Sequence, residues 1–367
     1  MHICFLAPAN SIHTVRWVNS LVNRNHKLTL LTMHPPEEHE IDSRIDIILL
    51  PFRAPLGYYL NSVKAKKIIS ELKPDILNTH YASGYGTLSR FINYKPTLLS
   101  VWGSDVYDFP YESTSKQKIL VKNLRAADRL ASTSHVMKKQ TEKFSPKGMK
   151  IEVTPFGVDM NRFKPSSKEK ANNQITIGMI KALESKYGPE YLIKGVHLLI
   201  ERLKKEYKYK IVDQIKLLIV GKGSQLKELQ DLVTEYQMDE IVTFTGAVPH
   251  TEVPAYLHKI DIYCAPSTLD SESFGVAIVE ASASGLPVIV SNVGGLPEVV
   301  KDKETGFVVE PKNAEEISEK LYDLVNDEAL RERLGKQGRI FSESLYDWEE
   351  NVSIMESIYK DMTSIKE

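Results

Sequence analysis

The chain has 367 residues, of which 42% are hydrophobic and 26% are charged, and its formal net charge is −1. This composition is typical of a globular protein with enough apolar material for buried cores. It excludes a membrane-spanning chain, because no apolar run approaches the ~20 residues that a transmembrane helix needs. It also excludes a disulfide scaffold, because Cys4 and Cys264 are the only cysteines and both stand in strand-like runs.

The first half of the chain alternates short apolar runs with amphipathic segments. Residues 14–24 place Val15, Val18 and Leu21 at helical spacing, and residues 59–73 form a second amphipathic pattern. Strands are predicted at His2–Pro8, Lys27–Thr32, Asp46–Phe52, Asp75–Thr79, Thr97–Trp102, Arg129–Thr133 and Lys150–Pro155. Because the chain starts directly in a strand, without the features of a signal peptide, we expect a cytoplasmic protein.

The pattern restarts after a polar stretch, residues 164–174, where we place a domain boundary. Further strands are predicted at Ile175–Met179, Lys216–Val220, Ile241–Thr245, Asp261–Pro266, Pro287–Ser291 and Gly306–Val309, and the tail from Asn313 onward is helical by pattern. Strands that alternate with helices predict parallel βαβ units. The expected fold is therefore α/β, with two Rossmann-like doubly wound domains that face a cleft. Residues 1–165 and a closing helix at about 346–367 would form one domain, and residues 166–345 the other.

Charge is distributed unevenly between the two halves. Residues 1–165 contain 23 Lys and Arg against 14 Asp and Glu, whereas the remainder contains 24 against 34. A basic half joined to an acidic half suggests that the first half meets something anionic, such as a membrane surface, a pyrophosphate-linked lipid or an acidic polymer. Solvated surface charge without any partner is the alternative explanation.

The segment 271–290 contains the strongest candidate for chemistry. Glu272 precedes a turn at Phe274-Gly275, a helix-like run begins there with Val276, and Glu280 follows eight residues after Glu272. A glycine at a helix start lets backbone amides approach a phosphate, whose charge the helix dipole favours. Glu280 could then accept hydrogen bonds from a ribose diol, and Glu272 could meet sugar hydroxyls. Spacing alone equally allows two solvated glutamates.

This segment resembles the donor-site signature of the retaining GT-B glycosyltransferases of family 4. The signature has two glutamates separated by seven residues, Phe-Gly after the first and a Gly-x-Pro-Val strand after the second. Further matches in the expected order are 156–159 (FGVD), 163–165 (FKP), 219–223 (IVGKG) with Gly221 and Gly223, 244–246 (FTG) with Thr245 and Gly246, 294–298 (GGLPE) and 305–307 (TGF). The resemblance covers the C-terminal half closely and the N-terminal half loosely. It implies a nucleotide-sugar donor held by the C-terminal half and retention of anomeric configuration.

The resemblance also assigns the donor pyrophosphate to the loop after the first strand of the second domain. Lys186 stands at the family's lysine position, and Lys181 falls where the family usually has arginine. Lysine is a point charge, whereas arginine offers a planar bidentate fork. Lys181 and Lys186 are therefore candidate catalytic groups that stabilise the leaving group, with surface lysine as the alternative.

The N-terminal half departs from the family pattern where the acceptor would bind. Where many members have His-Gly after the fifth strand, this chain has Trp102-Gly103, followed by Asp105. Asp105 or His80 could take part in catalysis, and His80 could equally be a satisfied histidine at a strand end. Trp102 could stack on a sugar face or pack in the core.

These features predict a hexosyltransferase that moves a sugar from a UDP- or GDP-sugar to a lipid-linked or polysaccharide acceptor in cell-surface glycan biosynthesis. We expect no cofactor other than this co-substrate, no metal, no nucleic-acid partner and a peripheral location at the inner face of the cell membrane. Two alternatives stay open: a nucleotide-sugar epimerase on the same architecture, and a non-catalytic subunit that binds a glycan or a partner.

Overall fold

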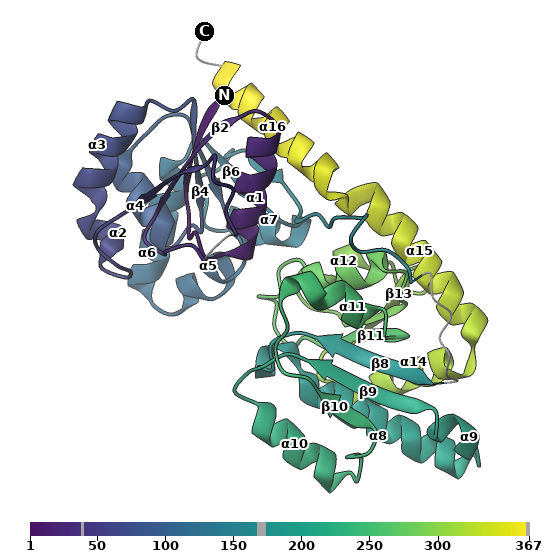
Figure 1. The fold of residues 1–367 in the computed structure, drawn as a ribbon. Helices are drawn as coiled ribbons and strands as arrows, with labels where there is room; N and C mark the ends of the chain where they lie inside the picture. Colours follow the sequence, from purple (N-terminus) through teal and green to yellow (C-terminus); the bar gives the residue numbers. More distant parts are fainter. Residues whose placement is uncertain (38–39, 167–173, 365–367) are drawn as a thin grey trace. The chain divides into compact units, whose positions relative to one another are not determined.

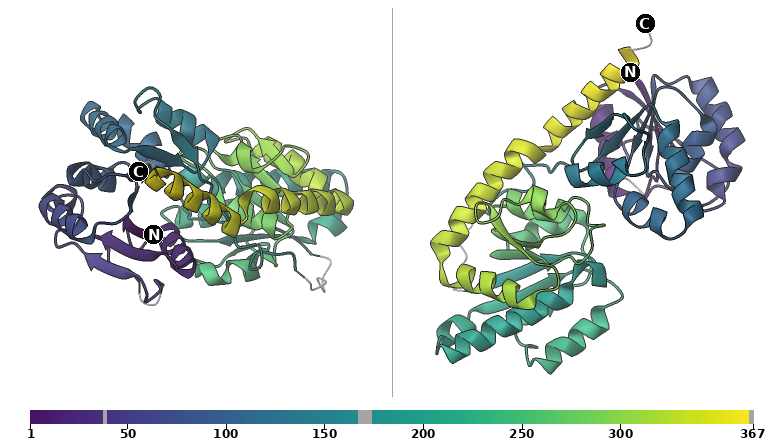
Figure 2. Two further views of the ribbon diagram at one scale, coloured as in Figure 1. Left: turned by 90° about the horizontal axis from the view of Figure 1, so that it is seen from above. Right: turned by 180° about the vertical axis from the view of Figure 1, so that it is seen from behind.

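The computed structural model describes residues 1–37, 40–166 and 174–364, and it divides into two compact units. The N-terminal unit comprises Met1–Phe156 together with the chain from Glu349 onward, and the C-terminal unit comprises Gly157–Trp348. Each unit is built around one parallel sheet that has helices on both of its faces (Figures 1 and 2). This is the doubly wound arrangement that the alternating pattern predicts.

The sheet of the N-terminal unit has seven parallel strands in the order β3-β2-β1-β4-β5-β6-β7. The strands are β1 (His2–Leu6), β2 (Lys27–Thr32), β3 (Asp46–Leu49), β4 (Ile76–His80), β5 (Thr97–Ser100), β6 (Arg129–Ser132) and β7 (Ile151–Val153). The helices are α1 (Ile12–Asn23), α2 (Gly57–Leu60), α3 (Ser62–Leu72), α4 (Gly84–Ile92), α5 (Ser104–Tyr107), α6 (Thr114–Ala126) and α7 (His135–Glu142). The strand order reverses between β1 and β4, so the loops that follow these two strands diverge there.

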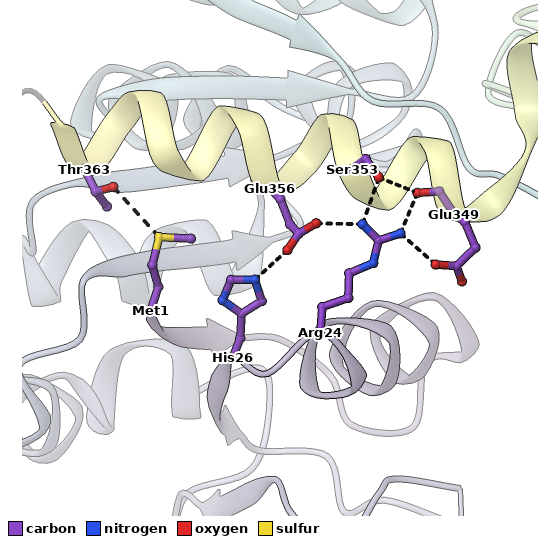
Figure 3. Close-up of polar contacts among 7 residues, drawn as sticks. All are labelled: Met1, Arg24, His26, Glu349, Ser353, Glu356 and Thr363. Atoms are coloured by element: carbon purple, nitrogen blue, oxygen red, sulfur yellow. Dashed lines mark hydrogen bonds and ion pairs between the residues drawn. The ribbon is translucent and has the colours of Figure 1, made fainter.

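The last helix, α16 (Trp348–Ser364), is attached to the N-terminal unit by a cluster around Arg24 (Figure 3). The Arg24 guanidinium donates to Glu356 Oε2 at 2.6 Å, to Glu349 Oε2 at 2.6 Å and to Ser353 Oγ at 2.8 Å. His26 Nε2 lies 2.7 Å from the other oxygen of Glu356. We call these five residues the α16 clasp. In addition to these polar contacts, α16 buries apolar side chains in the N-terminal unit, including Val352, Met355 and Tyr359.

The sheet of the C-terminal unit has six parallel strands in the order β10-β9-β8-β11-β12-β13. The strands are β8 (Ile175–Ile180), β9 (Ile215–Val220), β10 (Val242–Phe244), β11 (Ile262–Ala265), β12 (Val288–Ser291) and β13 (Gly306–Val309). The helices are α8 (Pro189–Lys205), α9 (Tyr209–Val212), α10 (Leu226–Glu235), α11 (Val253–Leu257), α12 (Val276–Ala283), α13 (Leu296–Val299), α14 (Ala314–Asn326) and α15 (Glu328–Tyr346). Buried side chains of α8, α10 and α14 form one apolar core with the strands.

The predicted strands are confirmed, each within a few residues of its expected ends, and the tail is helical as expected. The units divide between Phe156 and Gly157, earlier than the expected boundary after Pro165. The reason is that residues 157–165 belong to the C-terminal unit by their contacts. Val158 exchanges backbone hydrogen bonds with Tyr346 and Trp348, and Arg339 donates to the carbonyls of Met160 and Phe163. Most of the polar stretch that suggested the boundary, residues 167–173, lies outside the described residues.

Candidate donor site

The candidate site of the C-terminal unit lies where its strand order reverses, between β8 and β11. The connections after β8 and β11 lead to opposite faces of the sheet from this point. Two hydrogen bonds still join the loop after β8 to the loop after β11. The backbone N–H of Thr268 donates to the carbonyl of Lys186 at 2.8 Å, and its hydroxyl donates to the carbonyl of Ser185 at 3.0 Å. The carboxyl ends of parallel strands at such a reversal form the usual ligand crevice of doubly wound folds.

The structure brings Lys181 and Glu272 together at this point. Lys181 Nζ donates to Glu272 Oε1 at 3.0 Å, and both side chains line a small hollow with Met179, Tyr263, Ser267 and Gly275. Burial alone would lower the pKa of the Lys181 ammonium, but the negative charge of Glu272 and the neighbouring Tyr187 outweigh it, so that the pKa is raised. Lys181 is therefore a fixed positive charge at neutral pH.

One aromatic ring contacts both candidate phosphate-binding lysines. Lys181 Nζ lies 4.4 Å from the centroid of the Tyr187 ring, and Lys186 Nζ lies 4.8 Å from it. Both distances are within the range of a cation–π interaction. Tyr187 is therefore a shared contact of the two candidate phosphate-binding lysines.

Gly275 forms the turn that leads into α12. Its φ of 94° is in the left-handed region, and a side chain there would also collide with Leu296. Phe274 is buried before the turn, with its ring 5.4 Å from that of Tyr346, and Val276 is the first residue of the helix. Gly275 and Ala277, at the start of α12, line the same hollow as Glu272. A helix start in this place can bind an anion.

Glu280, one turn further along α12, is 5% exposed and has a partner that the sequence did not suggest. His250 Nε2 lies 2.7 Å from Glu280 Oε1. His250 is itself held by Arg162, which donates to its carbonyl, and by the ring of Phe163 at 5.7 Å. The imidazole thus fixes one carboxylate oxygen of Glu280.

The remaining predicted donor-site residues lie in the loops that follow β9 and β10. Gly221 follows β9 and bonds through its N–H to the carbonyl of Gly246 at 2.9 Å, so the two glycine turns are joined. A side chain at Gly221 or Gly223 would collide with the backbone of the loop after β8, at Lys181 and Leu183 respectively. Thr245 is exposed after β10. These glycines let three loops approach one another closely at the carboxyl edge of the sheet.

Asp105, a predicted catalytic residue, belongs to the N-terminal unit and is only 1% exposed. Its carboxylate accepts backbone N–H bonds from Ala82 at 2.8 Å, from Gly103 at 2.9 Å and from Trp102 at 3.0 Å. Burial raises the pKa of the carboxyl, and these backbone bonds partly offset the rise. The carboxylate therefore fixes the loops after β4 and β5 and is not exposed to an incoming acceptor.

Aromatic residues gather around the same loops of the N-terminal unit. The ring of Trp102 lies 4.2 Å from that of His80 and 4.8 Å from that of Tyr81, and His13 stacks on Phe156 at 4.0 Å. His80 is buried, which lowers its pKa to about 3, and its Nδ1 lies 3.3 Å from the hydroxyl of Thr14. His80 is accordingly a neutral, hydrogen-bonded histidine at a strand end.

Two residues of the candidate site were missed from the sequence, Tyr187 and His250. Tyr187 could have been found, because an aromatic residue directly after Lys186 in a phosphate-binding loop is a visible signal. His250 gave no such signal, because it meets Glu280 across 30 positions of the chain.

Of the residues described, no group of three or more His, Cys, Asp or Glu could hold a metal ion. No helix in the described ranges is long and apolar enough to cross a membrane.

Two Rossmann-like domains of this kind define the GT-B architecture. Residues 160–341 match the family model described as glycosyl transferases group 1, and residues 2–134 match the model described as glycosyl transferase 4-like. The two matches lie in different units and together span most of the chain. The chain belongs to the GT-B glycosyltransferases.

Curated relatives agree with this family. A glycosyltransferase of Methanocaldococcus jannaschii of uncharacterised activity is 26% identical over 94% of this chain and 93% of its own length. A GDP-mannose-dependent phosphatidylinositol monomannoside mannosyltransferase of Mycolicibacterium smegmatis is 32% identical, over 54% of this chain and 53% of its own length. This chain therefore matches nearly all of the first protein but only about half of the second.

Solved structures support the same fold at low sequence identity. Sucrose-phosphate synthase of Thermosynechococcus elongatus has a TM-score of 0.83 and 19% identity, with full coverage of both chains. HepE of Anabaena, in complex with UDP, has a TM-score of 0.81 and 17% identity over 98% of this chain and 100% of its own. At such identities the likeness establishes the architecture only.

Proposed function

We propose that this chain is a retaining hexosyltransferase that uses a UDP- or GDP-sugar and delivers the sugar to a lipid-linked or polysaccharide acceptor in cell-surface glycan biosynthesis. The observation that carries the proposal is the Lys181–Glu272 pair at the reversal of the strand order, beside the Gly275 turn. The names of the mycobacterial relative, which uses GDP-mannose, and of the Anabaena structure, which binds UDP, support a nucleotide donor.

The donor would exchange partners with the Lys181–Glu272 pair. The ammonium of Lys181 would donate to phosphate oxygens of the donor, and the carboxylate of Glu272 would accept hydrogen bonds from sugar hydroxyls. Lys186 and the amides after Gly275 would add positive potential at the same place. Glu280, whose Oε1 is held by His250, would offer its other oxygen to the ribose diol.

The reaction breaks the bond between the anomeric carbon and the phosphate oxygen and forms a bond from that carbon to an acceptor oxygen. Negative charge then collects on the nucleoside diphosphate, where Lys181 and Lys186 stabilise it electrostatically. The acceptor proton passes to the departing phosphate, on the same face of the sugar, so that configuration is retained. The two lysines supply the charge without a metal ion. We further propose that the enzyme is cytoplasmic and peripheral at the inner face of the membrane.

A thermal-shift screen against UDP, GDP, ADP and their sugars, with and without EDTA, tests the donor site. A ligand that binds only the native state stabilises it by about 2.7 kcal/mol at a hundredfold excess over Kd. We expect one nucleotide to raise the Tm, with no effect of EDTA, and Glu280→Gln to abolish the shift. The absence of a shift with every nucleotide would contradict the proposal. Conversion of the donor without any acceptor would favour the epimerase instead.

A further inference from the structure

The surface formed by α2, α3 and the loop before them exposes an unusual number of large apolar side chains. Val63 is 81% exposed, Leu56 68%, Leu60 55%, Phe52 49% and Tyr59 45%. Basic side chains are interspersed with these five: Arg53, Lys64, Lys66 and Lys67 are also exposed. We call these nine residues the α2–α3 surface. Contiguous apolar exposure with a polar rim marks an interaction site, whereas single exposed apolar residues do not.

Helical spacing explains how these residues come to share one face. Leu56, Leu60, Val63 and Lys67 follow one another at intervals of four, three and four residues, so they form one outward row. The opposite face of α3 is buried through residues that include Ala65 and Ile69. These helices thus have two apolar faces, of which the core formed by strand and α4 side chains covers only one.

The α2–α3 surface is held in shape from below. Asn61, between the two helices, is fully buried, and its side chain donates to the carbonyl of Phe52 at 2.8 Å and accepts from the Phe52 N–H at 3.2 Å. This pair of bonds fastens the preceding loop to the helices. Phe52 therefore stays beside the helical row without packing into the core.

The charges on and near this surface are almost all positive. Between residues 51 and 73 the sequence has five Lys and Arg but a single acid, Glu71, which lies 3.9 Å from Lys67. Within the described part of the chain, Arg53, Lys64 and Lys66 form no ion pair. A surface with exposed apolar groups and unpaired cations is complementary to an anionic lipid bilayer, which has negative headgroups above an apolar interior.

We propose that the α2–α3 surface docks the N-terminal unit onto an anionic lipid bilayer. Leu56, Leu60 and Val63 would enter the boundary between headgroups and acyl chains, while Arg53, Lys64 and Lys66 would contact lipid phosphates. This inference deepens the proposed function, since it names the surface through which the enzyme would reach a lipid-linked acceptor. It involves no residue of the candidate donor site.

A second copy of the chain is the competing occupant, and charge argues against it. In a symmetric dimer the same surface meets itself, so Arg53, Lys64, Lys66 and Lys67 of both copies would be brought together. Those like charges would oppose the association, whereas the same charges favour an anionic bilayer.

Co-sedimentation of the full chain with phosphatidylcholine vesicles, with and without phosphatidylglycerol, measures the docking. We expect binding to the anionic vesicles only, weakened by added salt because the charges are exposed. The double variant Leu60→Asp/Val63→Asp should bind at least tenfold more weakly. The matched control is Ile340→Asp/Leu345→Asp on α15, where the wild-type side chains are 48% and 51% exposed. That control should bind as the wild type does.

A fluorescent label reports whether the surface itself enters the bilayer. Val63→Cys can be labelled selectively with an environment-sensitive dye, because Cys4 and Cys264 are both fully buried. The emission should shift to the blue on anionic vesicles, and the same label on Leu345→Cys should not respond.

The proposal is overturned if the wild type does not bind anionic vesicles, or if the two double aspartate variants bind these vesicles with equal affinity. It is also overturned if sedimentation equilibrium shows a dimer that Leu60→Asp/Val63→Asp dissociates, because the surface would then be an interface between copies. Nucleotide binding is measured separately by thermal shift. If the chain binds UDP but no vesicles, only the proposed docking surface is overturned. If it binds vesicles but no nucleotide, only the proposed transferase function is overturned.

Discussion

The two units each contain a cluster of cations and carboxylates, and the clusters differ in how fully their donors are used. In the α16 clasp the guanidinium of Arg24 bonds two carboxylates and a hydroxyl, and Glu356 bonds both Arg24 and His26. In the C-terminal unit Lys181 Nζ donates one hydrogen bond among the residues described, to Glu272 Oε1 at 3.0 Å. An ammonium has three donors, so further acceptors can still bind it.

The two clusters also differ in their surroundings: packed helices in one case, and loops that line a hollow in the other. The clasp joins the C-terminal end of α1 and the turn after it to α16, and both helices bury apolar side chains. The Lys181–Glu272 pair lies at loop ends next to Gly275 and lines a hollow. A cluster whose guanidinium already bonds several acceptors stabilises the fold, whereas an ammonium with spare donors beside a glycine turn can exchange its partner for a ligand. The comparison can be tested on both sides.

The largest effect should come from removing the charge of Lys181. Lys181→Met keeps most of the side-chain length, but it withdraws the cation that would stabilise the leaving group. We expect kcat to fall by about 10²–10³-fold, the size measured when one charge-stabilising donor is lost. Steady-state kinetics with the donor identified by thermal shift provide the measurement.

Lys194→Met is the matched control for that experiment. Lys194 precedes Gly195 in α8, and its Nζ lies 5.3 Å from the ring of Tyr191, an arrangement similar to that of Lys186 and Tyr187. It should keep full turnover, because it stands within a helix and outside the loops that form the site. A folded Lys181→Met variant with wild-type turnover would contradict our assignment of the donor site.

An intermediate effect, on stability, is expected at the clasp. Arg24→Met should lower the free energy of unfolding by about 1–3 kcal/mol, because Glu356, whose side chain is only 15% exposed, loses a charged hydrogen bond. Denaturant titration measures the loss. Turnover per folded molecule should be unchanged, whereas a change comparable to that of Lys181→Met would remove the distinction between the two clusters.

The clasp should also depend on pH in a defined direction. Burial alone would raise the pKa of Glu356, but the hydrogen bonds from His26 and Arg24 outweigh it and lower the pKa below the ordinary 4.5. A carboxyl with a depressed folded pKa stabilises the fold above its unfolded pKa and loses that contribution as pH falls through the folded value. The protection of α16 amides from hydrogen exchange, taken relative to the intrinsic exchange rate at each pH, should therefore fall below about pH 4.5 in the wild type. Glu356→Gln should lose this dependence.

The sequence predicted the parts of the molecule that depend on local patterns. The strands, their alternation with helices and the Glu272–Glu280 spacing are all local, and the structure has the two glutamates on either side of the Gly275 turn. The structural roles of Asp105 and of the α16 clasp could not be predicted, because each depends on contacts that only the folded chain brings together. Asp105 bonds the N–H of Ala82 across 23 positions, and Arg24 meets Glu356 across 332. Sequence patterns located the charged residues but could not distinguish buried supports from exposed functional groups.

The smallest predicted effect is at His250, which tests whether a satisfied contact can also occur inside the ligand site. His250→Ala removes the 2.7 Å contact to Glu280 Oε1 and leaves that buried carboxylate free to turn. We expect the KM for the donor to rise about tenfold, equivalent to one hydrogen bond of about 1.4 kcal/mol, with kcat nearly unchanged. His250→Gln, which can still donate to the carboxylate, should restore most of the affinity. If His250 only supported the fold, both variants would lower the Tm and leave the KM of the folded fraction unchanged. A rise in KM with rescue by glutamine would instead show that a contact in the donor site can be satisfied on one oxygen and kept open on the other.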